Sequence, residues 1–322
     1  MRPFELTAPA TVEAALTGGD GAFLAGGTTL VDLMKLNVLT PERVLDINGL
    51  PLRGIDTGDG LRIGALERMS DVAAHPGVYP MISRALLLSA SQQLRNMASI
   101  GGNLVQRTRC TYFRDVAMPC NKREPGSGCP AITGANRMHA VLGTSDHCVA
   151  THASDLAVAL VALDAEIRLF GATSARTVAL RDFYRLPGDS PEVENDLRIG
   201  ELITEVRVPR LDWAAQRSTY VKVRDRQSYE FALCSAAVAL DIQDDRIVDA
   251  RVAAGGVATV PWRLPEVEAA LRGAPATLAA FESAASVAAD GARPLSANGF
   301  KVSLLERTVV RALLELTEGS HS

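Results

Sequence analysis

Residues Phe23-Leu24-Ala25-Gly26-Gly27-Thr28-Thr29-Leu30 form a short apolar run that leads into a glycine pair and two hydroxyl side chains, and the amphipathic residues 31–36 follow. This pattern predicts a strand, a sharp turn and a helix. A glycine pair lets the backbone approach a ligand closely, and amides that precede a helix favour negative charge. A phosphate group is the natural ligand. The alternative is an ordinary strand-to-helix turn with Thr28 or Thr29 as the N-cap, which a lone Gly-Gly-Thr favours.

A second glycine loop, Ala98-Ser99-Ile100-Gly101-Gly102-Asn103-Leu104, repeats this chemistry further along the chain. Its glycine pair lies beside groups that donate to phosphate or ribose oxygens. Two such loops can flank one diphosphate and neutralise it with backbone amides, without a lysine. Neither loop has the Gly-x-Gly-x-x-Gly spacing, so a Rossmann nicotinamide domain is disfavoured.

The composition describes an ordinary folded chain of more than one domain. Its 322 residues are 47 % hydrophobic and 22 % charged, which excludes a chain too polar to collapse. The formal net charge of −4 and the pI near 5.8 argue against nucleic acid or an anionic membrane as the main partner. Any anion must therefore be bound locally.

No segment predicts membrane insertion. The apolar stretch at 156–163 lies between Asp155 and Asp164 and is too short to cross a bilayer. The first residues lack the basic region and apolar core of an export signal, so a soluble protein in the cytoplasm is the default expectation.

The pattern along the chain predicts α/β structure followed by α+β structure. Residues 4–211 alternate β-branched runs with helical patterns, which predicts strands at 22–25, 43–47 and 61–63 and a helix at 30–36. Further along, the expected elements are consecutive antiparallel strands at 218–223, 231–242 and 246–255, a turn at Asp244-Asp245, and helices at 265–271, 276–289 and 297–316. The boundary is placed near residue 215, which gives domains at 1–215 and 216–322.

Four of the five cysteines lie in an aperiodic stretch between Arg107 and His152; they are Cys110, Cys120, Cys129 and Cys148. The fifth, Cys234, lies in an apolar strand pattern and is predicted to be buried. Four thiolates suit one metal centre, but the absence of a Cys-x-x-Cys pair leaves the choice open. The alternatives are an iron–sulfur cluster, unligated cysteines, or zinc with His139, His147 or His152 as substitute ligands.

No pattern predicts catalytic side chains. The sequence shows no Ser-His-Asp arrangement, no carboxylate pair of readable spacing and no Walker loop.

The residues at 24–30 and 99–104, together with Ser154-Asp155, resemble the FAD-binding subunit of the xanthine dehydrogenase and molybdenum hydroxylase family. The segments 200–203 and 220–224 resemble later parts of this family, so the resemblance covers nearly the whole chain. Within the family, the chain is most similar to the flavin subunit of bacterial, periplasmic-type aldehyde oxidoreductases. Thr29 departs from the pattern because many relatives have Asp at this position.

The resemblance implies a two-subdomain FAD-binding fold, a C-terminal domain of antiparallel strands and helices, and an FAD site. The implied cofactor-binding residues are Leu24, Ala25, Gly26, Gly27, Thr28, Thr29, Leu30, Ser99, Gly101, Gly102, Asn103, Asp155, Ile203 and Lys222. Asp155 is expected as a hydrogen-bonding anchor, with an N-cap of the 156–163 helix as the alternative. Ile203 and Lys222 match positions near the adenine or flavin end, with a core isoleucine and a surface lysine as the alternatives.

The resemblance also favours iron–sulfur at the cysteines, because a few relatives carry an inserted loop whose four cysteines ligate a 4Fe-4S cluster. The insert here is placed at 107–147. Its basic residues, Arg107, Arg109, Arg114, Lys122 and Arg123, are interpreted as charges that offset the cluster or dock a partner, or as a solvated loop.

The function that the resemblance implies is electron transfer through FAD and iron–sulfur in a heterotrimeric aldehyde oxidoreductase. A large subunit would hold the molybdopterin cofactor, a small subunit two 2Fe-2S clusters, and this chain would pass electrons to an external acceptor. A twin-arginine signal on a partner would carry the complex to the periplasm. The alternatives are a stand-alone flavin reductase of the cell-wall-precursor type and a zinc-stapled, non-catalytic binding module.

Overall fold

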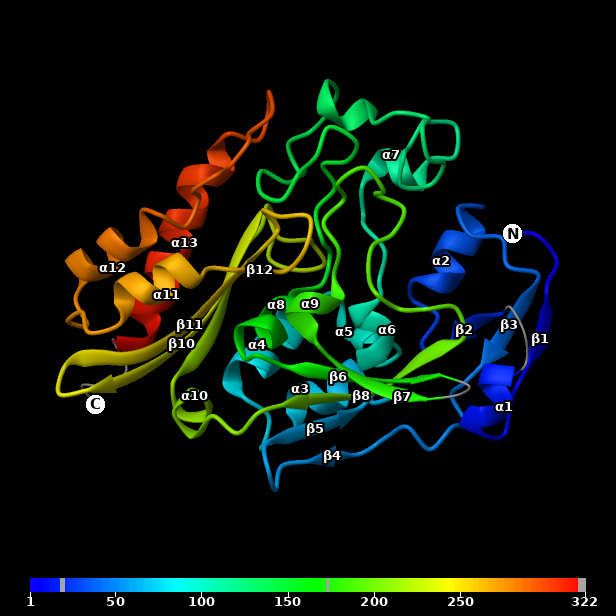
Figure 1. Cartoon of the computed structure of the whole chain (residues 1–322), viewed down its shortest axis with the longest axis horizontal. Helices are drawn as coiled ribbons and strands as arrows, with labels where there is room; N and C mark the ends of the chain where they lie inside the picture. The colour runs from blue at the N-terminus through cyan, green and yellow to red at the C-terminus, as the bar shows by residue number, and fades with distance from the viewer. Residues whose placement is uncertain (18–20, 172–173, 318–322) are drawn as a thin grey trace.

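The structure is a computed structural model that describes residues 1–17, 21–171 and 174–317. Strands of the described residues form three sheets (Figure 1). The first is a small parallel sheet of order β1-β3-β2, made of Glu5–Thr7 (β1), Ala22–Leu24 (β2) and Arg43–Asp46 (β3). Helix α1 (Val12–Thr17) connects β1 to β2, and helix α2 (Leu30–Lys35) connects β2 to β3. The first glycine loop therefore joins β2 to α2, as the sequence predicts.

The second sheet is antiparallel and has the order β4-β5-β8-β6-β7. Its strands are Ile55–Asp56 (β4), Leu61–Gly64 (β5), Glu166–Gly171 (β6), Ala175–Ala179 (β7) and Glu201–Val208 (β8). The helices between them are Met69–Ala74 (α3), Pro80–Leu88 (α4), Gln92–Arg95 (α5), Ile100–Leu104 (α6), Asp155–Ala162 (α8) and Leu180–Phe183 (α9). The predicted mixture of strands and helices is confirmed. Of the three sheets in the described residues, the first is parallel and the other two are antiparallel.

Helix α8 is the central element of the core. Every residue of α8 is buried, which is typical of a helix that is apolar on all sides. It contacts α4 on one side and strands of the third sheet on the other, so it holds the two halves of the chain together (Figure 1).

The third sheet, of order β12-β11-β10-β9, follows the short helix α10 (Asp212–Gln216). It consists of Ser218–Val223 (β9), Cys234–Gln243 (β10), Arg246–Gly255 (β11) and Trp262–Arg263 (β12), and it is covered by Pro265–Leu271 (α11), Leu278–Ala285 (α12) and Phe300–Thr317 (α13). The turn at Asp244-Asp245 is confirmed: φ is 49° and 60°, the left-handed values of a tight hairpin. Strand β10 begins at Cys234 rather than at residue 231, and Cys234 is buried, as predicted.

The cysteine-rich insert connects α6 to α8 and lies above the sheets in Figure 1. Its regular structure is limited to α7 (Thr111–Arg114) and the 3-10 turn η1 (Pro130–Ile132) among the described residues. Hydrogen bonds hold it in place: Asn298 donates to the His139 and Ala140 carbonyls, and Lys301 donates to the Met138 carbonyl. The predicted aperiodic stretch is therefore a packed loop.

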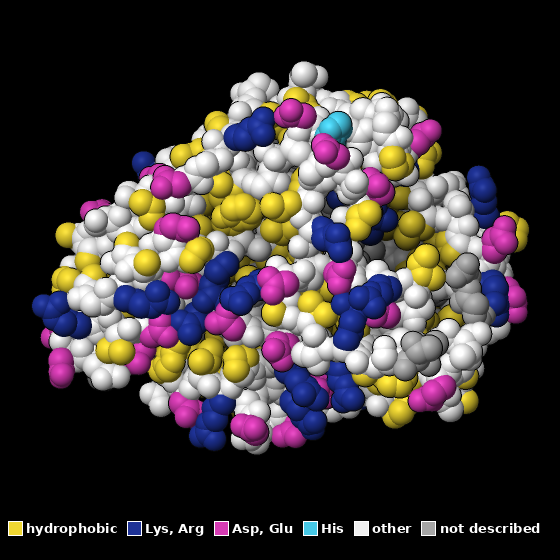
Figure 2. Space-filling view, in the orientation of Figure 1, with side chains coloured by type: hydrophobic (Ala, Val, Ile, Leu, Met, Phe, Trp, Pro, Cys, Tyr) yellow, Lys and Arg dark blue, Asp and Glu magenta, His cyan; other side chains and the backbone are white. Residues whose placement is uncertain are grey.

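Basic and acidic side chains alternate over the face drawn in Figure 2, which agrees with the absence of a uniformly basic surface. In the described part of the chain, no helix has both the length and the apolar character needed to cross a membrane.

Candidate functional site

The two glycine loops lie directly against each other. A Cβ atom on Gly26 would lie 2.0 Å from the Met97 carbonyl oxygen and 2.9 Å from Cα of Ala98, the residue before Ser99. Only glycine allows this approach without a shift of the backbone. Gly27 has a φ of 70°, so the turn itself also uses glycine's conformational freedom.

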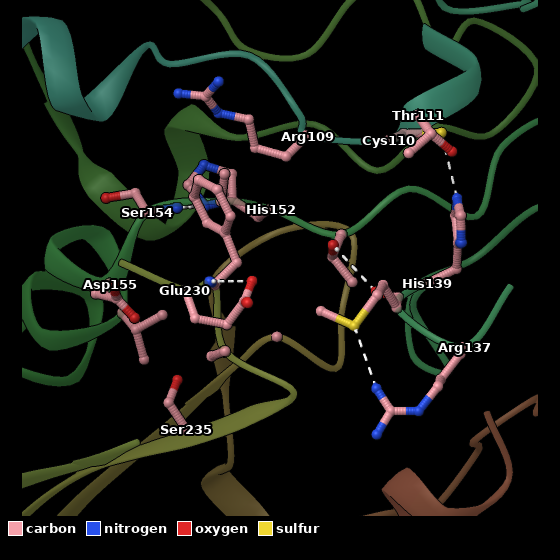
Figure 3. A pocket seen from close by; sticks show the side chains of 18 of the residues that line it. Arg109, Cys110, Thr111, Arg137, His139, His152, Ser154, Asp155, Glu230 and Ser235 are labelled. Carbon is pink, nitrogen blue, oxygen red and sulfur yellow. Dashed lines mark hydrogen bonds between the residues drawn. The ribbon is translucent and has the colours of Figure 1, made fainter. Parts of the chain in front are cut away.

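The loops open onto a cavity with two chambers. The first chamber, of about 210 Å³, is lined by Thr28, Thr29, Gly102 and Asn103, and also by Lys222. The second, of about 320 Å³, extends toward the insert (Figure 3). Both chambers are lined by Arg109, Ala153, Asp155, Glu230 and Phe231. The cavity is therefore elongated and joins the loops to the insert.

The first loop presents free backbone amides. Within the residues that the structure describes, the amides of Gly26, Gly27, Thr28 and Thr29 have no acceptor. Thr29 occupies the N-cap position of α2, but its side chain makes no capping hydrogen bond. These amides remain available to a ligand with hydrogen-bond acceptors.

The sequence suggests that both loops bind a diphosphate with free backbone amides, but the amides at 100–103 of the second loop already have acceptors. Ser99 is the N-cap of α6, and its hydroxyl accepts a hydrogen bond from the Gly102 amide at 3.2 Å. The amides of Ile100, Gly101 and Asn103 donate to the carbonyls of Glu67, Ala65 and Ser99. What this loop offers the cavity is therefore the bare surface of Gly102 and the side chain of Asn103.

Asp155 is the centre of a buried polar network on the cavity floor. Its carboxylate accepts hydrogen bonds from Ser89, Tyr220 and Lys222, at 2.9, 2.7 and 2.7 Å. Burial raises the pKa of Tyr220, so this phenol stays a hydrogen-bond donor. The N-cap alternative for Asp155 is wrong, because Ser154 caps α8 by accepting from the Ala157 amide.

The surface alternative for Lys222 is also wrong. Its side chain is 1 % exposed, and it donates to the Leu88 carbonyl as well as to Asp155. Removal of one partner of such a buried ion pair strongly destabilises the folded protein, because the other charge stays buried without compensation. Ile203 is 5 % exposed, belongs to the large hydrophobic core and does not line either chamber.

Two side chains that the sequence did not single out hold both loops together. The Asn48 side-chain amide donates to the Ala25 carbonyl at 2.9 Å, and its oxygen accepts from Arg68 at 2.9 Å. Arg68 also donates to the Met97 carbonyl. A signal for Asn48 was present: it follows β3, and the carboxyl ends of parallel strands meet at one sheet edge, where Gly26 also lies. No comparable sequence signal exists for Arg68.

The four cysteines between Arg107 and His152 line one small apolar cavity, together with His139 and His147. The Cys110 sulfur lies 3.2 Å from Nε2 of His139. Burial raises the pKa of Cys110 to about 11 and also raises the pKa values of Cys129 and Cys148, so these thiols are held in the protonated form.

The expectation of a 4Fe-4S cluster is wrong for this arrangement. The cysteines meet, as a common site requires, but the cavity between them has a volume of about 10 Å³, no more than one water molecule needs. The described residues contain no group of three or more His, Cys, Asp or Glu side chains that could hold a metal ion. The same finding removes the zinc alternative with His139, His147 or His152.

Comparison with known families matches both halves of the chain. Residues 2–211 match the family described as the FAD binding domain in molybdopterin dehydrogenase. Residues 219–316 match the CO dehydrogenase flavoprotein C-terminal domain.

Individual relatives agree with these matches. The aldehyde oxidoreductase FAD-binding subunit PaoB of Escherichia coli (strain K12) is 48 % identical over 300 residues, which cover 91 % of this chain and 90 % of that protein. The glyceraldehyde dehydrogenase medium chain of Sulfolobus acidocaldarius is 33 % identical and covers 76 % of this chain and 71 % of its own length. A solved structure of carbon monoxide dehydrogenase from Hydrogenophaga pseudoflava superposes with a TM-score of 0.75 at 26 % identity, over 98 % of both chains.

Proposed function

We propose a function for this chain from the family to which it belongs, the FAD-binding family of molybdopterin dehydrogenases, and from the cavity that its glycine loops form. The chain is the flavoprotein subunit of a molybdenum-dependent aldehyde oxidoreductase and passes electrons from partner subunits to an external acceptor. The observation that supports this most directly is the joint placement of the two loops on one elongated cavity.

The residues present fit an FAD molecule. Its diphosphate needs hydrogen-bond donors, and the free amides of Thr28 and Thr29 and the Asn103 side chain supply donors beside the first chamber. Gly102, which has no side chain, lines the same chamber. Bound FAD exchanges electrons singly or in pairs, which is the chemistry that this position requires.

The chain's own side chains bind and orient rather than react. Asp155 is paired with Lys222, and Glu230 is paired with Arg226 at 3.2 Å, so both carboxylates that line the chambers already have cationic partners. A stand-alone flavin reductase, the alternative function, needs an acid poised for substrate beside the flavin. The paired state of both carboxylates favours the electron-transfer role.

The assembly is proposed from the relatives. PaoB is named an FAD-binding subunit, and the Sulfolobus protein a medium chain, so both belong to larger enzymes. The proposed partners of this chain are a large molybdenum-cofactor subunit and a small 2Fe-2S subunit. The cytoplasm, or the periplasm through a partner's signal, stays a prediction.

Purification of the chain alone and with its two partners tests this function. The chain alone should carry one FAD and show the visible flavin absorption band. Aldehyde should bleach this band only when both partners are present, because the chain has no aldehyde-oxidising group of its own. A chain without flavin, or a flavin that aldehyde reduces in the absence of partners, would contradict the proposal.

A further inference from the structure

We propose that Arg109, on the cysteine-rich insert, is a binding residue for the diphosphate of FAD, an inference that rests on the proposed function. The insert would then supply part of the cofactor site.

Arg109 lies where the two chambers meet and lines both of them. Its guanidinium donates to Oδ2 of Asp32 at 2.8 Å and lies 5.3 Å from the centre of the Phe231 ring. In Figure 3 it is drawn beside His152, on the opposite side of the chamber from Ser235. These contacts hold the guanidinium at the cavity wall before any ligand binds.

The first glycine loop and Arg109 are connected through one helix. Asp32 lies on α2, one turn after Thr28 and Thr29, so the carboxylate that positions Arg109 follows directly on the loop with free amides. Arg109 and these two threonines line the same chamber. A group bound by the loop amides therefore lies in the chamber that Arg109 faces.

The charges around the cavity leave Arg109 without a carboxylate of its own. Asp32 accepts hydrogen bonds from both Arg109 and Arg114, and Arg114 makes two of them, at 2.8 and 3.0 Å. These two guanidinium groups hold the pKa of Asp32 below its usual range, so Asp32 contributes a single negative charge against two positive ones. One positive charge is left over.

The other cations on the described cavity walls are paired one to one. Lys222 pairs with Asp155, Arg226 with Glu230, and Arg137 with Asp225. Among the described lining residues, the surplus charge therefore sits at Arg109. Only one of its N–H donors is used by a described residue, which leaves the planar fork that suits phosphate oxygens.

Flavin binding by matched variants of the apoprotein tests this inference, with FAD and riboflavin as probes, since riboflavin lacks the phosphates. Arg109→Ala should weaken FAD binding by about 10- to 100-fold, the range of a lost charge-assisted hydrogen bond, and leave riboflavin binding unchanged. Arg109→Lys should recover part of the loss because it restores the charge. Arg107→Ala is the control: Arg107 lies on the same loop, pairs with Glu194 and lines neither chamber.

Three results would overturn the assignment. They are unchanged FAD affinity in Arg109→Ala, equal losses for FAD and riboflavin, or an equal loss in Arg107→Ala, which would indicate damage to the insert. Wild-type chain that binds no FAD would instead reject the proposed function, and this inference with it.

Discussion

Gly26 is the residue on which the contact between the two loops depends. Its missing side chain lets the first loop lie against the Met97 and Ala98 backbone, and Asn48 and Arg68 then fix the loops from the other side. Van der Waals contact between backbones allows no adjustment by a rotamer change. A change at this one position must therefore move a whole loop.

Gly26→Ala should destabilise the chain by about 3 kcal/mol and abolish most FAD binding, because the new methyl group would overlap the Met97 carbonyl. Chemical denaturation and FAD titration measure the two effects. Gly49→Ala is the control, since a Cβ at Gly49 meets no atom within 4 Å. Equal stability and affinity of the two variants would show that the loops do not depend on this close approach.

The residues of the candidate site that the sequence predicts are those whose signal is local. A glycine pair followed by hydroxyl residues is visible in a short window, so Gly26–Thr29 and Gly102-Asn103 could be predicted. Arg68 and Arg109 could not, because each acts through partners that are distant in the chain. The burial of Lys222 likewise follows from its partner Asp155, which no local pattern shows.

At the scale of elements, α13 carries a buried lysine that joins the C-terminal domain to the insert. Lys301 donates to the Met138 and Gly256 carbonyls, at 3.1 and 2.6 Å, and has no exposed surface. Burial lowers the pKa of Lys301 from 10.5 to about 8. The folded chain therefore releases this proton at a lower pH than the unfolded chain does.

This shift predicts a pH-dependent contribution to stability. Between pH 8 and 10.5 the unfolded chain binds a proton at Lys301 that the folded chain does not, so the contribution of Lys301 rises with pH across this window. Lys301→Met removes the titration. The unfolding free energy of wild type minus that of the variant should rise by about 3 kcal/mol from pH 8 to pH 10.5. Denaturation curves at several pH values measure it, and a constant difference would contradict the burial of a charged amine.

The elements themselves were largely predictable where they follow a simple pattern. The hairpin between β10 and β11 is marked by Asp244-Asp245, and α13 by its apolar spacing. The start of β10 was placed too early, because residues 231–233 are apolar but belong to the segment that reaches the cavity through Phe231. Hydrophobicity alone does not distinguish a strand from a loop that lines a ligand cavity.

In the whole molecule, segments from both halves of the chain meet at one cavity. The cavity takes residues from the two glycine loops, the insert, α8 and β9. The four cysteines between Arg107 and His152 do converge, but the cluster they were expected to hold does not fit the space between them. Cysteine spacing predicts that thiols meet more reliably than it predicts what they bind.

In the proposed site, both glycine loops and Arg109 surround one diphosphate of FAD. A crystal structure of the chain with FAD bound tests it most directly. Diphosphate density is expected in the chamber lined by Thr28, Thr29, Gly102 and Asn103, within hydrogen-bond distance of the amides at 26–29 and of the Arg109 guanidinium. A diphosphate located outside this chamber, with the amides of the first loop still unpaired, would contradict it.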